Sequence, residues 1–213
     1  MREVATTLTD YLLTVVCLVC AWRLARVGAP RLHGPVVFFA AFAAAALLGG
    51  TWHGFFSDQQ GPAQAMLWWL TMLFAGMAAA GLALTGLELL GARASPRIIL
   101  LLAALLAIYA VLAWHDARFL LSLIASVAGI LLCAIGLVRH LRLPGGPGAR
   151  LALAGLAVSV LAAIAQQQRV ALDRTHFDHN ATYHVLLLPA LALLHAGFLR
   201  LTRTPAVTRG PSS

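Results

Sequence analysis

The sequence predicts an all-α protein built as a seven-transmembrane-helix bundle. Of its 213 residues, 61% are hydrophobic and only 10% are charged, whereas a soluble domain carries roughly 25% charged residues. Seven apolar runs have about the 20 residues that a bilayer-spanning helix needs. Since no repeat period is evident, we expect one transmembrane domain over residues 1–203 and a disordered tail, rich in Pro, Gly, Ser and Thr, over residues 204–213.

The seven runs follow one another with short polar connections. Turn-forming sequences lie where a span should end, as in Gly28-Ala29-Pro30 and Gln60-Gly61-Pro62. The expected spans are Leu8–Ala25, Pro35–Phe56, Ala63–Leu90, Arg97–Trp114, Phe119–Val138, Leu151–Gln168 and Ala181–Leu199.

The distribution of Arg residues predicts the orientation. All 15 basic residues are Arg, a bias typical of a GC-rich bacterial genome. Eleven of them fall on one side of the expected spans and four, Arg2, Arg118, Arg169 and Arg174, on the other. The Arg-rich side of a membrane protein faces the cytoplasm, so the N-terminus is expected outside and the C-terminus in the cytoplasm of a bacterial inner (plasma) membrane.

The net charge of +8 does not indicate a nucleic-acid partner. Most Arg residues lie beside apolar spans, where topology accounts for them, and no basic stripe alternates with aromatic residues. We therefore expect membrane lipids as partners and no nucleic acid; the oligomeric state stays open. Cys17 and Cys20 have redox-motif spacing but lie inside an apolar run, so we expect them to pack as small hydrophobic side chains.

Two polar clusters, Gly49–Gly54 and His176–His184, meet at the outer side in this threading. Ionisable side chains in membrane segments are costly and are usually functional. His53 and His184 are the leading candidates for a zinc site, because zinc binds imidazole nitrogen and catalytic sites combine three protein ligands with one open position. Gly49, Gly50 and Gly54 should let a neighbouring helix approach His53 closely.

The third metal ligand is less directly indicated. His179 and His184 are five residues apart, about 140° around a regular helix, so both reach one ion only if the helix starts between them. Asn180 has the better spacing, but amides are poor zinc ligands. His195 lies about 16 Å deeper than His184, where an interhelical hydrogen bond is expected. His115 and His176 fit an interfacial role that needs no metal.

The seven spans, His53 and the segment Phe177–His184 resemble the CREST superfamily, which includes alkaline ceramidases and progestin and adipoQ receptors. The resemblance, closest to uncharacterised bacterial members, implies a zinc-dependent hydrolase of lipid amides. It assigns His53 and His184 as metal ligands. Asn180 occupies the place of the family's other segment-seven His, with His179 adjacent as its substitute.

We therefore expect a metal-dependent amidohydrolase that acts on a lipid amide or ester. His53, His179 and His184 would bind zinc, Asp178 would orient a ligand or act as general base, and Thr51 would bind the oxyanion. Two alternatives remain open. One is a non-enzymatic sensor or transporter whose histidines respond to pH, and the other is a haem protein with His53 and His184 as axial ligands.

Overall fold

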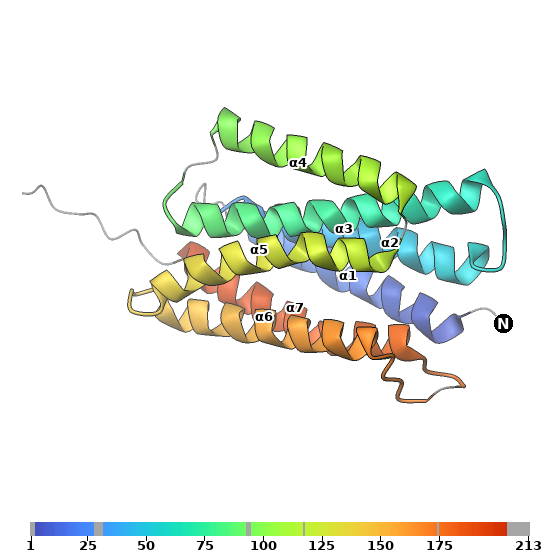
Figure 1. The fold of residues 1–213 in the computed structure, drawn as a ribbon. Helices are drawn as coiled ribbons and strands as arrows, with labels where there is room; N and C mark the ends of the chain where they lie inside the picture. Colours follow the sequence, from blue (N-terminus) through green and yellow to red (C-terminus); the bar gives the residue numbers. More distant parts are fainter. Residues whose placement is uncertain (1–2, 28–31, 93–94, 117, 174, 204–213) are drawn as a thin grey trace, which may run out of the picture.

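A computed structural model describes residues 3–27, 32–92, 95–116, 118–173 and 175–203. These residues form seven α-helices and one short π-helical segment, η1, that continues the second helix (Figure 1). The helices are α1 (Val4–Arg26), α2 (Gly34–Thr51), η1 (Trp52–Phe56), α3 (Pro62–Leu89), α4 (Pro96–His115), α5 (Phe119–His140), α6 (Gly146–Gln167) and α7 (His179–Arg203).

Seven of these segments, with α2 and η1 taken together, are long and apolar enough to cross a membrane. The expected number of spans and the all-α class are confirmed, and the protein is a multi-pass membrane protein. α1, α2, α3 and α5 pack in succession, and α7 packs against both α1 and α6. α4 lies at the margin against α3 and buries only Tyr109 and Ala113 (Figure 1).

Several helices begin earlier than the hydrophobic runs suggest. α1 starts at Val4 and not Leu8, and α6 starts at Gly146 and not Leu151. In α6 the early start fits Pro147, because proline is favoured in a first turn, where its missing N–H costs nothing. The early start of α1 places Asp10 well inside a helix. The expected tail, residues 204–213, lies outside the described residues.

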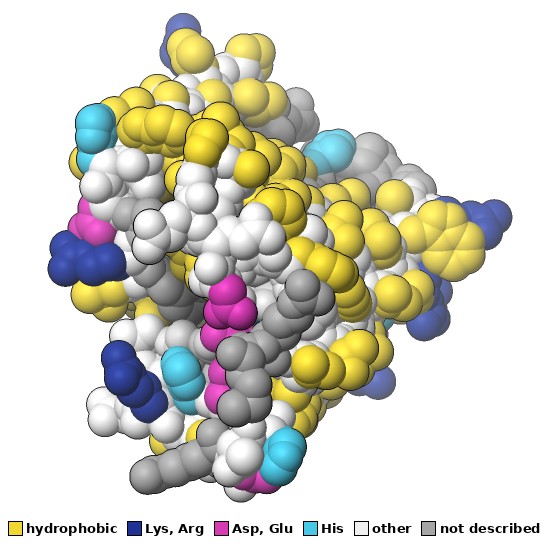
Figure 2. Space-filling view, turned by 90° about the vertical axis from the view of Figure 1, so that its right-hand side faces the viewer, with side chains coloured by type: hydrophobic (Ala, Val, Ile, Leu, Met, Phe, Trp, Pro, Cys, Tyr) yellow, Lys and Arg dark blue, Asp and Glu magenta, His cyan; other side chains and the backbone are white. Residues whose placement is uncertain are grey.

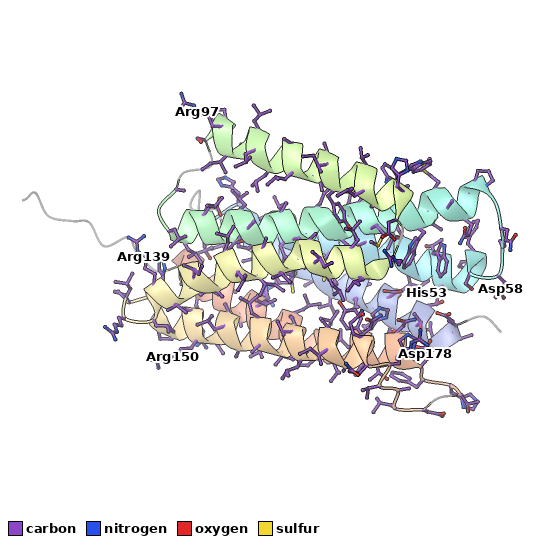
Figure 3. The ribbon with its side chains drawn as sticks, viewed as in Figure 1. His53, Asp58, Arg97, Arg139, Arg150 and Asp178 are labelled. Atoms are coloured by element: carbon purple, nitrogen blue, oxygen red, sulfur yellow. The ribbon has the colours of Figure 1, made fainter. Side chains whose placement is uncertain are left out.

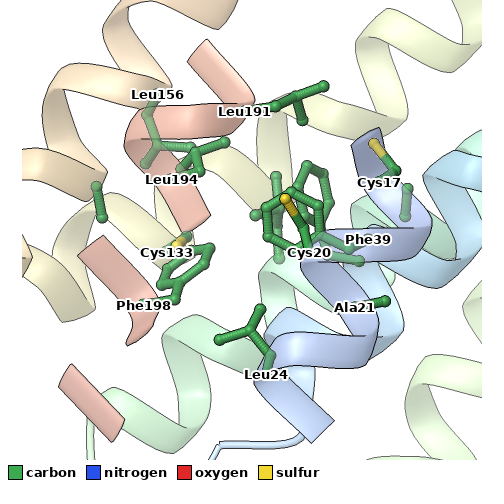
Figure 4. Close-up of a cluster of buried hydrophobic side chains, with 14 of the residues drawn as sticks. Cys17, Cys20, Ala21, Leu24, Phe39, Cys133, Leu156, Leu191, Leu194 and Phe198 are labelled. Carbon is green, nitrogen blue, oxygen red and sulfur yellow. The ribbon is translucent and has the colours of Figure 1, made fainter. Parts of the chain in front are cut away.

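Small and apolar side chains fill the interior of the bundle (Figure 4). Phe39 and Phe198 are fully buried, and Cys17, Cys20 and Cys133 are buried free thiols. The packing role expected for Cys17 and Cys20 is therefore confirmed. Small residues let membrane helices pack closely, and α6 and α7 use this device: a Cβ added at Gly197 would lie 2.6 Å from the backbone nitrogen of Ala152.

The two ends of the bundle differ in charge. Arg97, Arg139 and Arg150 lie at one end, whereas His53, Asp58 and Asp178 lie at the other (Figure 3). Of the ten described Arg residues, only Arg118 and Arg169 belong to the end that holds His53. We call that end, formed by the start of α1, η1 and the start of α7, the histidine end.

Candidate functional site

Two glycines bring α1 against the end of α2. A Cβ at Gly50 would lie 2.8 Å from the Cβ of Asp10, and one at Gly54 would lie 2.9 Å from Thr7 Cγ2. Asp10 Cβ is bonded to the backbone of α1 and cannot move away, so this approach of α1 requires glycine at position 50. The expected close approach of a helix is confirmed, and the partner is α1. It sets Asp10 beside the segment that bears His53.

His53 lies on η1, the single π-helical stretch in the described part of the chain. Such stretches occur frequently at functional sites. The buried ring of His53 packs edge-on against Trp52 and Trp68, with ring centroids 5.1 and 6.3 Å away. Its Nδ1 atom lies 2.5 Å from Glu3 Oε2 as an ion-pair contact, without the alignment of a hydrogen bond. The carboxylate of the residue just before α1 therefore meets the imidazole of His53.

His184 lies in the second turn of α7 and is also buried. Its Nδ1 atom is 3.0 Å from the hydroxyl of Thr9, and its Nε2 atom is 3.3 Å from Oδ1 of Asp10. Both partners belong to α1, so this helix supplies an oxygen to each ring nitrogen of His184. Asp10 itself is only 5% exposed, which makes it a carboxylate buried inside a membrane bundle.

Asp10, His53 and His184 all line a partly open cavity of about 240 Å³. The side chains of Gln166, on α6, and Asn180, on α7, also line it and are joined by a hydrogen bond of 3.3 Å. Away from these polar groups the walls are mainly apolar. They include Leu13, Phe38, Phe42, Leu82, Ile130, Leu187 and Leu191. The site is thus an apolar cavity with a polar, ionisable end.

The histidine end shows its polar groups on the surface as well (Figure 2). Acidic and histidine side chains emerge there among uncharged polar groups and backbone, while hydrophobic side chains cover the flanks. Glu3, whose side chain is 35% exposed, joins the buried site to this surface.

Asp178 and Thr51, the residues expected to assist catalysis, are not among the residues that line the cavity. Asp178 precedes α7 and its Oδ1 accepts hydrogen bonds from the Ala181 N–H and the Thr6 hydroxyl, each at 2.9 Å. This is the geometry of a helix N-cap, here tied to α1. Thr51 donates its hydroxyl to the carbonyl of Leu47 at 2.7 Å.

His179 is the first residue of α7. The helix therefore does not start between His179 and His184, and the separation of about 140° applies to the pair. His184 lines the cavity and His179 does not. The structure brings His53 and His184 to one site and leaves His179 outside it.

The remaining histidines lie elsewhere. His115 and His176 are exposed, and His176 contacts Asp173 in the loop before α7. His33 contacts Glu88 at the opposite end. His195 is buried edge-on against Phe39, and neither of its ring nitrogens has a hydrogen-bond partner among the described residues. The interhelical hydrogen bond expected for His195 is therefore absent from the described structure.

A metal ion fits this site only in part. Within the described ranges, no three His, Cys, Asp or Glu side chains are arranged to hold an ion. Two side chains, Asp10 and His184, have the spacing of zinc ligands. Ligand atoms with bonds of about 2.0–2.1 Å to a tetrahedral zinc ion lie about 3.3 Å apart. Asp10 Oδ1 and His184 Nε2 are 3.3 Å apart. His53 lines the same cavity, but it does not complete a three-ligand arrangement with them.

Three residues of the site were not indicated by the sequence: Glu3, which directly precedes α1, and Thr9 and Asp10 on α1. The sequence does contain an indication for Asp10, because a carboxylate inside an apolar span usually has a function. The expected span started at Leu8 and so set Asp10 near a helix end, where a charge needs no explanation.

The fold and the site define a multi-pass membrane protein with a buried carboxylate–histidine centre. The chain belongs to a family of unknown function, DUF6962, whose model matches residues 5–203 and hence all seven spans. No curated protein and no solved structure matches it.

Proposed function

We propose that this protein is a zinc-dependent hydrolase that cleaves an amide or ester bond of a lipid within the bundle. One observation carries the proposal: Asp10, His53 and His184 stand together at the polar end of an apolar cavity. A mainly apolar concavity with a few convergent polar groups is the usual form of a small-molecule site. The resemblance of the segments around His53 and His184 to the CREST superfamily supports the same chemistry.

The cavity walls favour a lipid as the substrate. Phe38, Phe42 and Leu13 line one part of it, and Leu187 and Leu191 another, so a hydrocarbon chain would meet matching apolar surface. The polar head with its scissile carbonyl would then lie at the end that holds the histidines.

His53 and His184 are the proposed metal ligands. The Nδ1 atom of His53 faces Glu3 and that of His184 faces Thr9. Metal-binding histidines usually direct one ring nitrogen to such an oxygen and use the other for the ion. When bound, zinc supplies Lewis-acid polarisation of the substrate carbonyl and lowers the pKa of a water molecule to about 7.

The polar side chains would handle the proton and the developing charge. Hydrolysis adds the oxygen of water to the carbonyl carbon, breaks the C–N or C–O bond and delivers a proton to the leaving group. Glu3, beside His53 and partly exposed, is the carboxylate placed to carry that proton. Asn180 accepts a hydrogen bond from Gln166 at its Oδ1, which leaves its NH₂ group to stabilise the carbonyl oxygen.

The proposal includes a topology, with the histidine end outside a bacterial inner membrane. Eight of the ten described Arg residues lie at the opposite end, which agrees with a cytoplasmic location for that end. A fluorescent protein that matures only in the cytoplasm, fused to the C-terminus, should be bright. A dark C-terminal fusion together with a bright N-terminal fusion would contradict this topology and indicate the opposite orientation.

The test of the function is metal analysis with a lipid-hydrolysis assay on detergent-purified protein. Wild type should retain about one zinc per chain and release fatty acid from an N-acyl lipid. His53→Ala and His184→Ala should lose both properties. His176→Ala removes an exposed imidazole from the same end and is the matched control, with both properties kept.

The other outcomes separate the alternatives. Wild type that holds no zinc after purification without chelators would refute the hydrolase and favour a sensor or transporter with titrating histidines. A Soret absorption band that disappears in His53→Ala would refute it in favour of a haem protein.

A further inference from the structure

We infer that Asp10, on α1, is the third protein ligand of the metal site, in place of His179. The inference rests on the zinc site proposed above and names the residue that completes it. It assigns the ion to a set of one carboxylate and two imidazoles from three helices, namely Asp10 on α1, His53 on η1 and His184 on α7.

The first support is the hydrogen bonding of His184. The Thr9 hydroxyl has one proton, and it donates to the carbonyls of Ala5 and Thr6 at 2.9 and 3.0 Å. Because carbonyl oxygens only accept, we assign the Thr9 proton to them and make the Nδ1–H group of His184, 3.0 Å away, the donor to Thr9. This tautomer leaves the Nε2 lone pair of a neutral ring directed to the side of Asp10.

The second support is the separation between Nε2 and Asp10 Oδ1. At 3.3 Å it exceeds the usual length of a charge-assisted hydrogen bond, about 2.7–2.9 Å. It equals the distance of about 3.3 Å expected between two ligands of one tetrahedral zinc ion. A lone pair and a carboxylate oxygen that face each other at this spacing form half of a metal site.

The third support is the local charge. Glu3 and Asp10 both lie against imidazoles at this end, and a buried carboxylate is costly without a compensating cation. The two described Arg residues of this end are exposed, and Arg118 is already paired with Asp116. A divalent cation between Asp10, His53 and His184 would supply the missing positive charge.

The packing of α1 gives Asp10 an advantage that His179 lacks. Gly50 holds α1 so close that its Cβ position would be 2.8 Å from Asp10 Cβ, and Asp10 lines the cavity together with His53 and His184. His179 is not among the lining residues. Asp10 already lies beside His184, and His53 lines the wall of the same cavity as the third donor.

The experiment compares metal affinity among Asp10→Asn, His179→Ala and wild type, by zinc competition with a chromophoric chelator. Removal of an outer-shell partner costs about 10–100-fold in metal affinity, so loss of the ligand Asp10 should cost more than about 100-fold. His179→Ala should bind zinc within about twofold of wild type. Thr9→Val, which removes the acceptor for Nδ1–H, should lose about 10–100-fold.

A second variant tests ligation directly and guards against a folding defect. Asp10→Cys loaded with Co²⁺ should show a thiolate-to-cobalt charge-transfer band in the near ultraviolet, because a thiolate that binds the ion donates charge to it. Wild type loaded with Co²⁺ should lack that band, since its three thiols are buried and none of them lines the cavity.

The outcomes distinguish the inference from the proposed function. Zinc bound equally well by Asp10→Asn and lost in His179→Ala would overturn the inference and leave the hydrolase intact. Zinc that depends on Asp10, in a wild-type protein that cleaves no lipid amide or ester, would support the inference and overturn the hydrolase. A wild type without zinc would overturn both.

Discussion

The contact between Gly50 and α1 predicts that a single methyl group will disturb the histidine end. An Ala Cβ at position 50 would meet Asp10 Cβ at 2.8 Å and Tyr11 Cε1 at 3.1 Å. The first of these atoms is bound to the backbone and cannot rotate away, so α1 has to shift. Overpacking of this kind typically costs about 1–3 kcal/mol.

Gly49→Ala is a matched control one residue away. Its Cβ would lie 3.5 Å from Thr71 Cγ2 and 3.6 Å from Asp10 Oδ2, which are ordinary contacts. Both substitutions gain the same helix propensity, about 1 kcal/mol, so that contribution cancels between them. Gly50→Ala should therefore be less stable than Gly49→Ala by about 1–3 kcal/mol.

Thermal unfolding of the two variants in the same detergent measures the difference. For a chain of this length, roughly 2–4 °C in Tm corresponds to 1 kcal/mol, so Gly50→Ala should melt at least about 2 °C below Gly49→Ala. Equal melting temperatures, or a more stable Gly50→Ala, would refute the close approach of α1 and α2 and with it the placement of Asp10.

Three further predictions concern groups outside the cavity. Asp178→Ala removes the N-cap of α7 and should lower the free energy of unfolding by about 0.5–2 kcal/mol, measured in detergent with Asp178→Asn as the milder control. Tyr109→Phe removes the bond from the Tyr109 hydroxyl to the carbonyl of Met72 and should cost about 0.5–1.5 kcal/mol; no change in stability would contradict a contribution of this hydrogen bond to the docking of α4. The hydrogen bond from Arg118 lowers the pKa of Asp116 below its ordinary value, so the ion pair is present at neutral pH and is lost as the pH falls through that lowered pKa. Arg118→Gln should raise the pKa of Asp116, as read from the carboxyl carbon shift in NMR, and an unchanged titration would contradict the pairing.

Much of the fold could be predicted because each span carries its own signal. A run of apolar residues must satisfy its backbone within the membrane, so length and hydropathy are enough to indicate a helix. All seven spans were found in this way. Their starts were less certain, because polar residues such as Glu3, Thr6 and Thr7 precede or begin α1 and hide its first turn.

The candidate site was predictable only in part. His53 and His184 stand out as imidazoles beside apolar spans, and both line the cavity. Asp178 also stands out, but its oxygen caps α7 and binds Thr6. From sequence alone, a carboxylate before a helix is equally suited to a cap and to catalysis, because both roles need the same exposed oxygen atoms.

The sequence by itself determined that this is a seven-span membrane protein with two histidines at one end, since both properties follow from local composition and helix direction. Only the tertiary structure decided that α1 joins them. The partners of His184, Thr9 and Asp10, lie about 175 positions away in the chain, and their meeting depends on the missing side chain of Gly50. Contacts of this kind depend on which helices become neighbours, and apolar periodicity along one helix carries no information about that choice.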